Sequence, residues 1–290
     1  MTIDLTKFIE LTVPQNLLII FISPIAAYVV INQMLPGLEI IPIMLSLSFA
    51  VLGFNSLNMV FDLELDKIDK PKRPLPSGRV TVDEAIKLSV FLFLTSFIIS
   101  FFTNLEFVLL LIAFFVVSYI YSSPIIHIKK YIWGSSFTGT FQYALIPVLS
   151  AATISPKELP VVFFVYVIST YLVISNVKDI EDVDGEKENK ISSFPILFGV
   201  NNTLALVLIG PIVLNVCIAI LIFANIIEKK YFYLVMASII SYSAFALLIW
   251  REHKKTYGNK NITTQSNVVT LTTIATLFSQ IVYAIVAMFG

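Results

Sequence analysis

The sequence predicts an all-α, polytopic membrane protein, and two observations carry this prediction. First, 57% of the 290 residues are hydrophobic and 13% are charged, with a mean hydropathy of +0.89, which is too apolar for a water-soluble domain. Second, nine apolar segments each come close to the roughly 20 residues that a helix needs to cross a bilayer. We therefore expect nine transmembrane helices in a single domain that covers residues 1–290.

The expected spans follow the chain in order, after a short interfacial helix. Residues 1–13 mix apolar and charged side chains and lack the basic start and the cleavage site of a signal peptide. Pro14 suits the start of the first span because a missing N–H is not needed there. The spans are 15–35, 39–60, 83–103, 105–122, 132–153, 158–176, 202–224, 229–250 and 266–289.

The distribution of basic residues predicts the orientation of the chain. With nine spans, the N-terminus shares one side with the loops after the second, fourth, sixth and eighth spans, and this side carries fifteen of the nineteen Lys and Arg residues. The positive-inside rule makes it cytoplasmic. We expect a multi-pass protein of the cell membrane with loops 67–82 and 177–201 in the cytoplasm. We infer no nucleic-acid or protein partner, and the lone Cys217 permits no internal disulfide.

The first polar motif lies at the cytoplasmic end of the second span. Asn58, Asp62 and Asp66 are spaced i, i+4, i+8, so on a helix they share one face and rise about 6 Å per step. Three oxygen-bearing side chains in such a row can hold a hard cation such as Mg²⁺, which prefers carboxylates together with substrate phosphates. The motif therefore predicts a Mg²⁺ site that shares its ion with a diphosphate.

A basic, proline-broken loop follows this motif. Three prolines and a Ser-Gly turn within residues 71–78 prevent a regular helix and make the loop rigid. Two of the three arginines in the protein, Arg73 and Arg79, lie here beside lysines that include Lys67. Guanidinium binds phosphate in a bidentate manner, which makes Arg73 a candidate phosphate clamp. For the lysines, ordinary positive-inside topology is an equally good explanation.

Two Ser/Thr-x-x-Glu sequences predict where later helices begin. Thr81 and Glu84 form a capping box before the third span, and Ser155 and Glu158 form another before the sixth. In each, the hydroxyl and the carboxylate satisfy backbone N–H groups that have no partner inside the helix. Both predictions are structural.

Further candidates for phosphate binding lie at the cytoplasmic end of the span 105–122 and in the loop after it. Tyr121 at its cytoplasmic end suits an aromatic belt, and can alternatively bind a phosphate oxygen or face a cation through its ring. Lys129 in the next loop is a candidate for the diphosphate. His127 has no ligand-spaced partner, so we interpret it as an interfacial residue.

The second polar motif lies at the cytoplasmic end of the sixth span. Asp179, Asp182 and Glu186 are spaced i, i+3, i+7 and again share one helical face, with Asn176 one turn earlier. The two motif regions hold ten of the nineteen acidic residues, and each begins within a hydrophobic run, where ionisable groups are costly and usually functional. If the motifs face each other, divalent cations bridging to a diphosphate relieve the repulsion between their carboxylates.

Together the two motifs resemble those of the UbiA superfamily of intramembrane prenyltransferases, and the nine-span topology extends the resemblance across nearly the whole chain. The matching sequences are Asn58-xxx-Asp62-xxx-Asp66, Pro71-x-Arg73-Pro74-x-Pro76-Ser77-Gly78-Arg79 and Lys178-Asp179-Ile180-Glu181-Asp182-xxx-Glu186. The resemblance implies a helical bundle around a central cavity. Mg²⁺ held by both motifs would bind the diphosphate of a polyprenyl donor, whose lipid tail would lie in an apolar tunnel.

The resemblance also implies roles for individual residues. The metal ligands would be Asn58, Asp62, Asp66, Asp179, Asp182 and Glu186. The diphosphate would be bound by Asn58, Lys67, Arg73, Arg79, Tyr121, Lys129 and Asn176. The residues taking part in catalysis would be Asp62, Asp66, Asp182, Arg73 and Lys178. Metal ions and cationic side chains would stabilise the departing diphosphate, so that the allylic C–O bond ionises and an acceptor traps the carbocation. Lys178 can equally be a topology lysine.

Within the superfamily, the motifs look most like the archaeal branch that makes ether lipids, which implies transfer of geranylgeranyl to geranylgeranylglyceryl phosphate. Val13, Ile126 and the pair Ile174-Ser175 stand where that branch usually has polar residues. An aromatic acceptor of the quinone-precursor type is therefore the alternative.

Two other classes of membrane protein fit the sequence less well. A transporter places acids near helix breaks at the bilayer midplane, whereas both motifs here lie at one membrane face. A CDP-alcohol phosphotransferase would need one short Gly/Arg-containing acidic motif, which the sequence lacks. Neither class explains the Pro-Arg-Pro loop.

Overall fold

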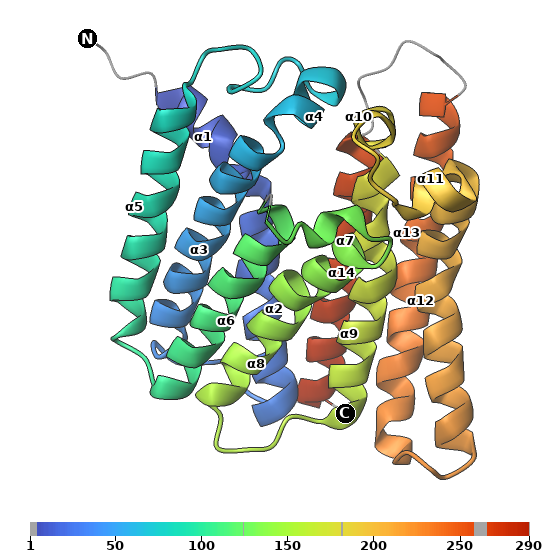
Figure 1. The fold of residues 1–290 in the computed structure, drawn as a ribbon. Coiled ribbons are helices and arrows are strands. Elements are labelled where there is room, and N and C mark those ends of the chain that lie inside the picture. The colour runs from blue at the N-terminus through green and yellow to red at the C-terminus, as the bar shows by residue number, and fades with distance from the viewer. Residues whose placement is uncertain (1–4, 124, 181, 258–265, 290) are drawn as a thin grey trace.

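The computed structural model describes residues 5–123, 125–180, 182–257 and 266–289, and within these ranges the ordered elements are helices, with no strand (Figure 1). Glu181 of the second motif and the first four residues of the expected interfacial helix lie outside the described residues. The helices are α1 (Leu5–Thr12), η1 (Pro14–Asn16), α2 (Leu17–Asn32), α3 (Ile40–Phe61), α4 (Leu63–Asp69), α5 (Val82–Ser100), α6 (Leu105–Ser122), η2 (Ile128–Lys130), α7 (Gly134–Thr140), η3 (Phe141–Leu145), α8 (Ile146–Thr153), α9 (Val161–Ile174), η4 (Ser175–Ile180), α10 (Val183–Glu188), α11 (Phe194–Phe198), α12 (Val200–Phe223), η5 (Lys229–Tyr231), α13 (Phe232–Tyr257) and α14 (Ser266–Phe289). This confirms the all-α class that composition predicts.

Six helical segments in the described part of the chain are long and apolar enough to cross a membrane. They lie in α3, α6, α9 continued by η4, α12, α13 and α14. α1 and α2 form a seventh candidate, a pair bent by 49° at the residues between them. The bend follows Val13, whose φ of 49° turns the chain before Pro14 starts η1.

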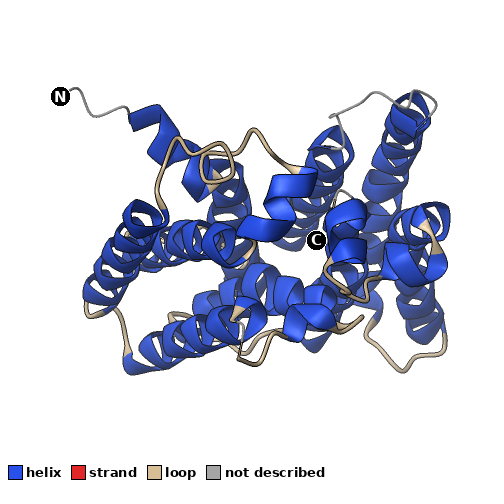
Figure 2. Ribbon diagram, turned by 45° about the horizontal axis from the view of Figure 1, so that its top comes forward, coloured by secondary structure: helices blue, strands red, loops and turns tan. Residues whose placement is uncertain are grey.

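The long helices stand side by side, and the short helices α4 and α10 lie together at the end of the bundle where α1 begins (Figure 1). Figure 2 tips this end toward the viewer and shows the short helices in front of the long ones. α3 packs against α5, and α13 packs against α12 and α14. The largest hydrophobic cluster joins α2, α8, α9, α12, α13 and α14, and a second joins α2, α3 and α6. Both acidic motifs therefore lie at one end of a well-packed bundle.

Small residues hold α3 against α5. The hydroxyls of Ser46 and Ser96 each donate to the backbone carbonyl of the other residue, at 2.8 and 2.7 Å. Ser89 donates to the carbonyl of Gly53 at 2.8 Å. Hydroxyls that bond across helices let two backbones approach closely where the hydrophobic effect gives little help between lipid-embedded helices. These contacts hold α3 against α5 from Ser46 to Gly53, and the first motif begins beyond them at the C-terminal end of α3.

The predicted capping box before α5 is confirmed. Glu84 donates its backbone N–H to the Thr81 hydroxyl at 3.2 Å, and the Glu84 carboxylate accepts from the Thr81 N–H at 2.8 Å. The backbone N–H groups of Thr81 and Glu84 therefore both have hydrogen-bond partners within four residues.

The capping box predicted at Ser155 is wrong. α9 begins at Val161, after Pro160, and the Ser155 hydroxyl instead accepts from the backbone N–H of Lys157 at 3.1 Å and donates to Asn32 at 3.0 Å. Pro160 delays the start of the helix, because the residue before a proline is disfavoured in the helical region. Ser155 is left to bond α2 across the bundle.

A π-helical turn joins α7 to α8. Its five residues, Phe141–Leu145, lie between two α-helical halves that together cover the predicted fifth span. Gln142 in this turn is buried and donates its amide to the Ser118 hydroxyl of α6 at 2.7 Å. Such turns often mark functional parts of a helix.

Candidate active site

The first motif keeps the row predicted from its spacing. α3 ends at Phe61, yet the i→i−4 bonding continues through the kink, with Asp62 N donating to Asn58 O and Asp66 N to Asp62 O, both at 2.8 Å. Asp62 and Asp66 are buried, with 8% and 1% of their surface exposed. Two carboxylates are thus aligned inside the protein near one membrane face.

Lys129 neutralises Asp62. Its buried ammonium donates to Asp62 Oδ2 at 2.8 Å, and the Asn58 amide donates to the same oxygen at 2.8 Å. Asn58 is itself oriented by the Ser122 hydroxyl, which donates to its Oδ1 at 2.5 Å. Burial alone would raise the pKa of Asp62, but the charges of Lys129 and Lys178 outweigh it and hold that pKa below its usual range. The carboxylate is therefore ionised.

Arg73 neutralises Asp66. One guanidinium nitrogen of Arg73 donates to both carboxylate oxygens, at 2.9 and 2.8 Å. The proline-rich loop brings this arginine back over α4 through a series of turns, in which Arg73 N bonds Lys70 O and Ser77 N bonds Arg73 O. Leu75 in the same loop is buried and anchors it.

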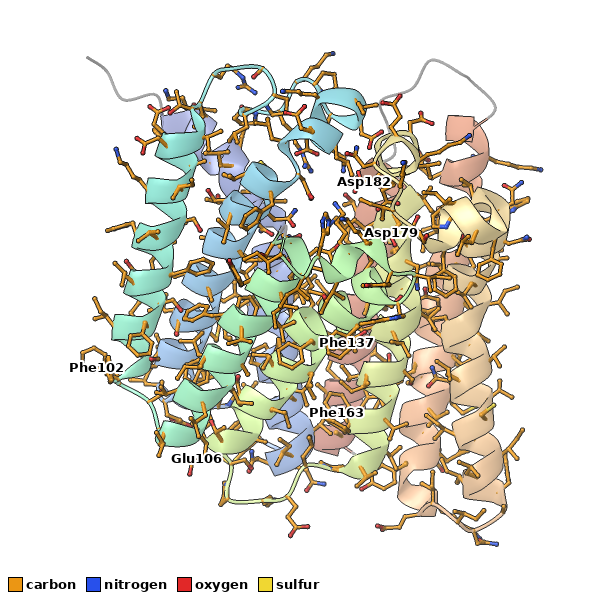
Figure 3. All side chains as sticks on the ribbon, in the orientation of Figure 1. Phe102, Glu106, Phe137, Phe163, Asp179 and Asp182 are labelled. Carbon is orange, nitrogen blue, oxygen red and sulfur yellow. The ribbon has the colours of Figure 1, made fainter. Side chains whose placement is uncertain are left out.

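The second motif is not one regular helix, which corrects the sequence-based expectation. Residues Ser175–Ile180 form a 3-10 helix, and α10 begins only after Asp182. Asp179 and Asp182 stay close in the chain's turn, because Asp182 N bonds Asp179 O at 3.3 Å. Figure 3 shows both side chains at the α10 end of the bundle. Both are almost fully buried.

The two motifs face each other across α4 and α10. The Lys70 ammonium pairs with the Asp182 carboxylate, and the Asp69 carboxylate accepts from the Gly185 N–H through both oxygens, at 2.9 and 3.0 Å. Burial raises the pKa of Asp182, but Lys70, Lys178 and Lys129 outweigh it, so that this pKa lies well below its usual range. Sequence reasoning missed the roles of Asp69 and Lys70, because nothing local to positions 69 and 70 indicates partners more than a hundred residues away.

Two carboxylates in the second motif have oxygens without a hydrogen-bond partner among the described residues. Both Glu186 oxygens and Asp179 Oδ2 are in this state, and both residues are buried. Burial and the charge of Asp179 raise the pKa of Glu186 to about 8. A buried carboxyl group is either protonated or paired with a cation, and oxygen donors of this kind suit Mg²⁺. The donor chemistry of the site therefore fits the predicted metal.

The six predicted metal ligands are not gathered into a ready-made site. Within the described ranges, no three His, Cys, Asp or Glu side chains lie close enough together to hold a metal ion as they stand. Lys129, Arg73 and Lys70 are instead each bonded to one of the motif carboxylates. A metal would have to compete with these ammonium and guanidinium groups.

Tyr121, Lys178 and Asn176 lie near the motifs in different ways. The Lys178 ammonium lies 5.9 Å from the centroid of the Tyr121 ring. The ring therefore faces a cation, as predicted, and this cation is a lysine side chain of the same protein. The Tyr121 hydroxyl is 3.3 Å from that of Ser135. Asn176 accepts from Ser136 at 2.8 Å and donates to two carbonyls of α9, bonds that hold helices together.

Lys67 and Arg79 are engaged by other residues. Lys67 pairs on the surface with Glu64 at 2.7 Å. Arg79 donates to both oxygens of Glu10 in α1, at 3.1 and 2.6 Å, and to the carbonyl of Lys72 at 2.8 Å. Diphosphate binding by these two residues stays a prediction, and the contacts of Arg79 make it a brace between α1 and the loop.

Comparison with known proteins gives consistent results. The sequence profile of the UbiA prenyltransferase family matches residues 18–271. The digeranylgeranylglyceryl phosphate synthase of Methanosphaera stadtmanae is 27% identical over 249 residues, which are 83% of this chain and 88% of that protein. The synthase of the same name from Thermococcus kodakarensis is 32% identical over 200 residues, 68% of this chain and 70% of that protein.

A solved structure shares the fold. The structure of a UbiA homolog from Archaeoglobus fulgidus bound to GPP and Mg²⁺ superposes with a TM-score of 0.69, covering 98% of this chain and 100% of that one, at 16% identity. At this identity the likeness shows the fold.

Proposed function

The chain belongs to the UbiA prenyltransferase family, and we propose that it transfers a geranylgeranyl group from its diphosphate to geranylgeranylglyceryl phosphate with the help of Mg²⁺. The protein is a prenyltransferase and an integral membrane protein, as the family match requires. Two findings support the acceptor: the name that the relatives from Methanosphaera stadtmanae and Thermococcus kodakarensis carry, and the motif pattern of the sequence.

The observation that carries the proposal is the meeting of two acidic motifs with three cations between them. Asp62, Asp66 and Asp182 are each paired with a Lys or Arg, while the Glu186 and Asp179 carboxylates have oxygens without partners. Such a site can accept a metal and a polyanion together. The carboxylates would turn to the metal, and the released cations would turn to the phosphates.

We assign the metal to both motifs. Asn58, Asp62 and Asp66 would hold it from one side, and Asp179, Asp182 and Glu186 from the other. Mg²⁺ seen in the related structure from Archaeoglobus fulgidus supports this choice of ion. When bound, it would neutralise charge on the diphosphate.

The residues of the chain supply the remaining chemistry. Arg73, Lys129 and Lys178 would stabilise the charge that develops on the diphosphate when the allylic C–O bond breaks. The glycerol hydroxyl oxygen then bonds to the allylic carbon and its proton is lost, so that one ether bond replaces one ester bond and diphosphate leaves. Asn58, Tyr121 and Asn176 would complete the proposed diphosphate site together with Lys67 and Arg79.

We propose nine membrane spans in one domain. α2, α5 and the α7–α8 segment would join the six long apolar helices, with the apolar interior accepting the prenyl tail. The excess of basic residues at the motif end supports a cytoplasmic active site.

The test is diphosphate release by the purified protein from geranylgeranyl diphosphate and Mg²⁺. One arm receives geranylgeranylglyceryl phosphate and the other 4-hydroxybenzoate, with Asp62→Ala and Asp182→Ala as controls. We expect prenylation of the glycerol phosphate that both substitutions abolish. Turnover of the aromatic acid alone would reassign the acceptor. Activity that persists with a chelator and in both variants would refute the metal-diphosphate site.

A further inference from the structure

The first turn of α10 has an unusual cap. The backbone N–H groups of a first helical turn have no partner inside the helix, and an Asp at the N-cap normally accepts from one of them. Asp182 occupies the N-cap of α10 but makes no such bond. Its carboxylate is paired with Lys70 instead.

Asp69 takes the place of the missing cap from another part of the chain. The third residue of α10 is Gly185, and its N–H reaches both Asp69 oxygens at 2.9 and 3.0 Å. The approach is close, because a Cβ on Gly185 would lie 3.0 Å from Leu65 Cγ and closer still to the Asp69 carboxylate, so that these side chains would have to shift. Asp69 ends α4, three residues after Asp66, so that this bond joins the two motif segments directly.

We propose that Asp69 is a positioning residue that caps α10 in place of Asp182 and thereby leaves the Asp182 carboxylate available to the active site. Without Asp69, the free N–H of Gly185 would attract the carboxylate of its own N-cap residue, because that is the ordinary capping geometry. Asp182 would then turn away from Lys70 and from the first motif. Asp69 and Gly185 are 116 residues apart in sequence, so their bond joins the two halves of the site beside the Lys70–Asp182 pair.

This inference rests on the proposed function for its kinetic consequence, whereas its structural part can be tested separately. The variants are Asp69→Ala, which removes the acceptor, and Asp69→Asn, whose amide oxygen can still accept from Gly185. Glu64→Ala is the matched control, because Glu64 is an exposed acid on the same helix and its loss changes the charge equally. Each is compared with the wild-type chain in detergent micelles.

Two measurements are made on every variant. Hydrogen exchange of the peptide containing Gly185 reports the cap, and we expect about tenfold faster exchange at this amide in Asp69→Ala, with wild-type exchange in Asp69→Asn and Glu64→Ala. The Mg²⁺ concentration for half-maximal turnover reports the position of Asp182. We expect it to rise on the order of tenfold in Asp69→Ala, with a smaller change in kcat, and to stay within about threefold of wild type in Asp69→Asn.

The outcomes separate this inference from the proposed function. Unchanged exchange at Gly185 in Asp69→Ala would refute the cap. Slow exchange together with a large kinetic defect in Asp69→Asn would also overturn the proposal, since Asp69 would then act through its charge. A wild-type protein without prenyl transfer would refute the proposed function, while the exchange data would still decide the cap.

Discussion

Replacing Lys129 with methionine is expected to destabilise the protein strongly, although it removes a charge from an apolar region. Lys129 and Asp62 are both buried, and their charged atoms are 2.8 Å apart. At this separation and an effective dielectric constant of about 20, their attraction is about 6 kcal/mol. Desolvation of both ions offsets part of it, so that removing one partner should cost about 3–5 kcal/mol. The loss arises because Asp62 would remain as a buried charge beside the neutral Asn58 amide.

The measurement is thermal unfolding in detergent micelles at one fixed heating rate, followed by the fluorescence of the two tryptophans. For a chain of this size, the expected loss lowers Tm by roughly 10 °C. Lys130→Met is the matched control, because Lys130 is the exposed neighbour in the same helical turn, and its removal should change stability by less than about 0.5 kcal/mol.

A second variant tests the cause. Asp62→Asn combined with Lys129→Met removes both charges, and we expect it to recover most of the loss, because a neutral buried pair costs far less to desolvate than a lone buried charge. Equal Tm values for Lys129→Met and the wild type would refute the reasoning. A double variant whose Tm is no higher than that of Lys129→Met would also refute it.

Three further predictions concern the loop and its neighbours. Arg73→Ala should raise the KM for the prenyl diphosphate about 10- to 100-fold, because a charge-assisted contact is lost, and Arg73→Lys should recover only part of it; an unchanged KM in steady-state kinetics would contradict the clamp. Glu10→Arg and Arg79→Glu should each impair activity, and the charge-swapped double variant should restore it. A rise in KM for the diphosphate that persists in the double variant would mean that Arg79 binds phosphate. Thr81→Ala should lower the free energy of unfolding by about 1 kcal/mol through loss of the α5 cap, and a changed KM would show that this cap also affects the site.

Local rules explain which parts of the fold the sequence predicts correctly. The capping box at Thr81 depends on residues within one turn of each other, and it forms as expected. The row from Asn58 to Asp66 also depends on helical spacing alone, and the backbone bonds preserve it through the kink at Asp62. In both cases the information lies within a few positions of the residue concerned.

The failures occur where a distant residue or a second local signal decides the outcome. Ser155 has the right spacing for a cap, but Pro160 moves the start of the helix and Asn32 offers another partner. Asp69 has no distinguishing signal in the sequence, because its partner Gly185 is brought near it only by the tertiary fold, and the same holds for the contact of Arg79 with Glu10. The sequence places both motifs at one membrane face, whereas the pairing of their carboxylates with Lys and Arg depends on the tertiary fold.

The π-helical turn between α7 and α8 accommodates one extra residue without changing the faces that the two halves of this segment present. Five residues with i→i+5 bonding turn the chain through about the same angle as four α-helical residues. Deleting one residue from Phe141–Leu145 would therefore allow ordinary α-helical bonding and leave Ser136 bonded to Asn176. The local change would fall on Gln142, whose amide reaches Ser118 of α6 from this turn. Homologous sequences should therefore vary by one residue here without a change in the face that Gly134–Thr140 turns toward η4.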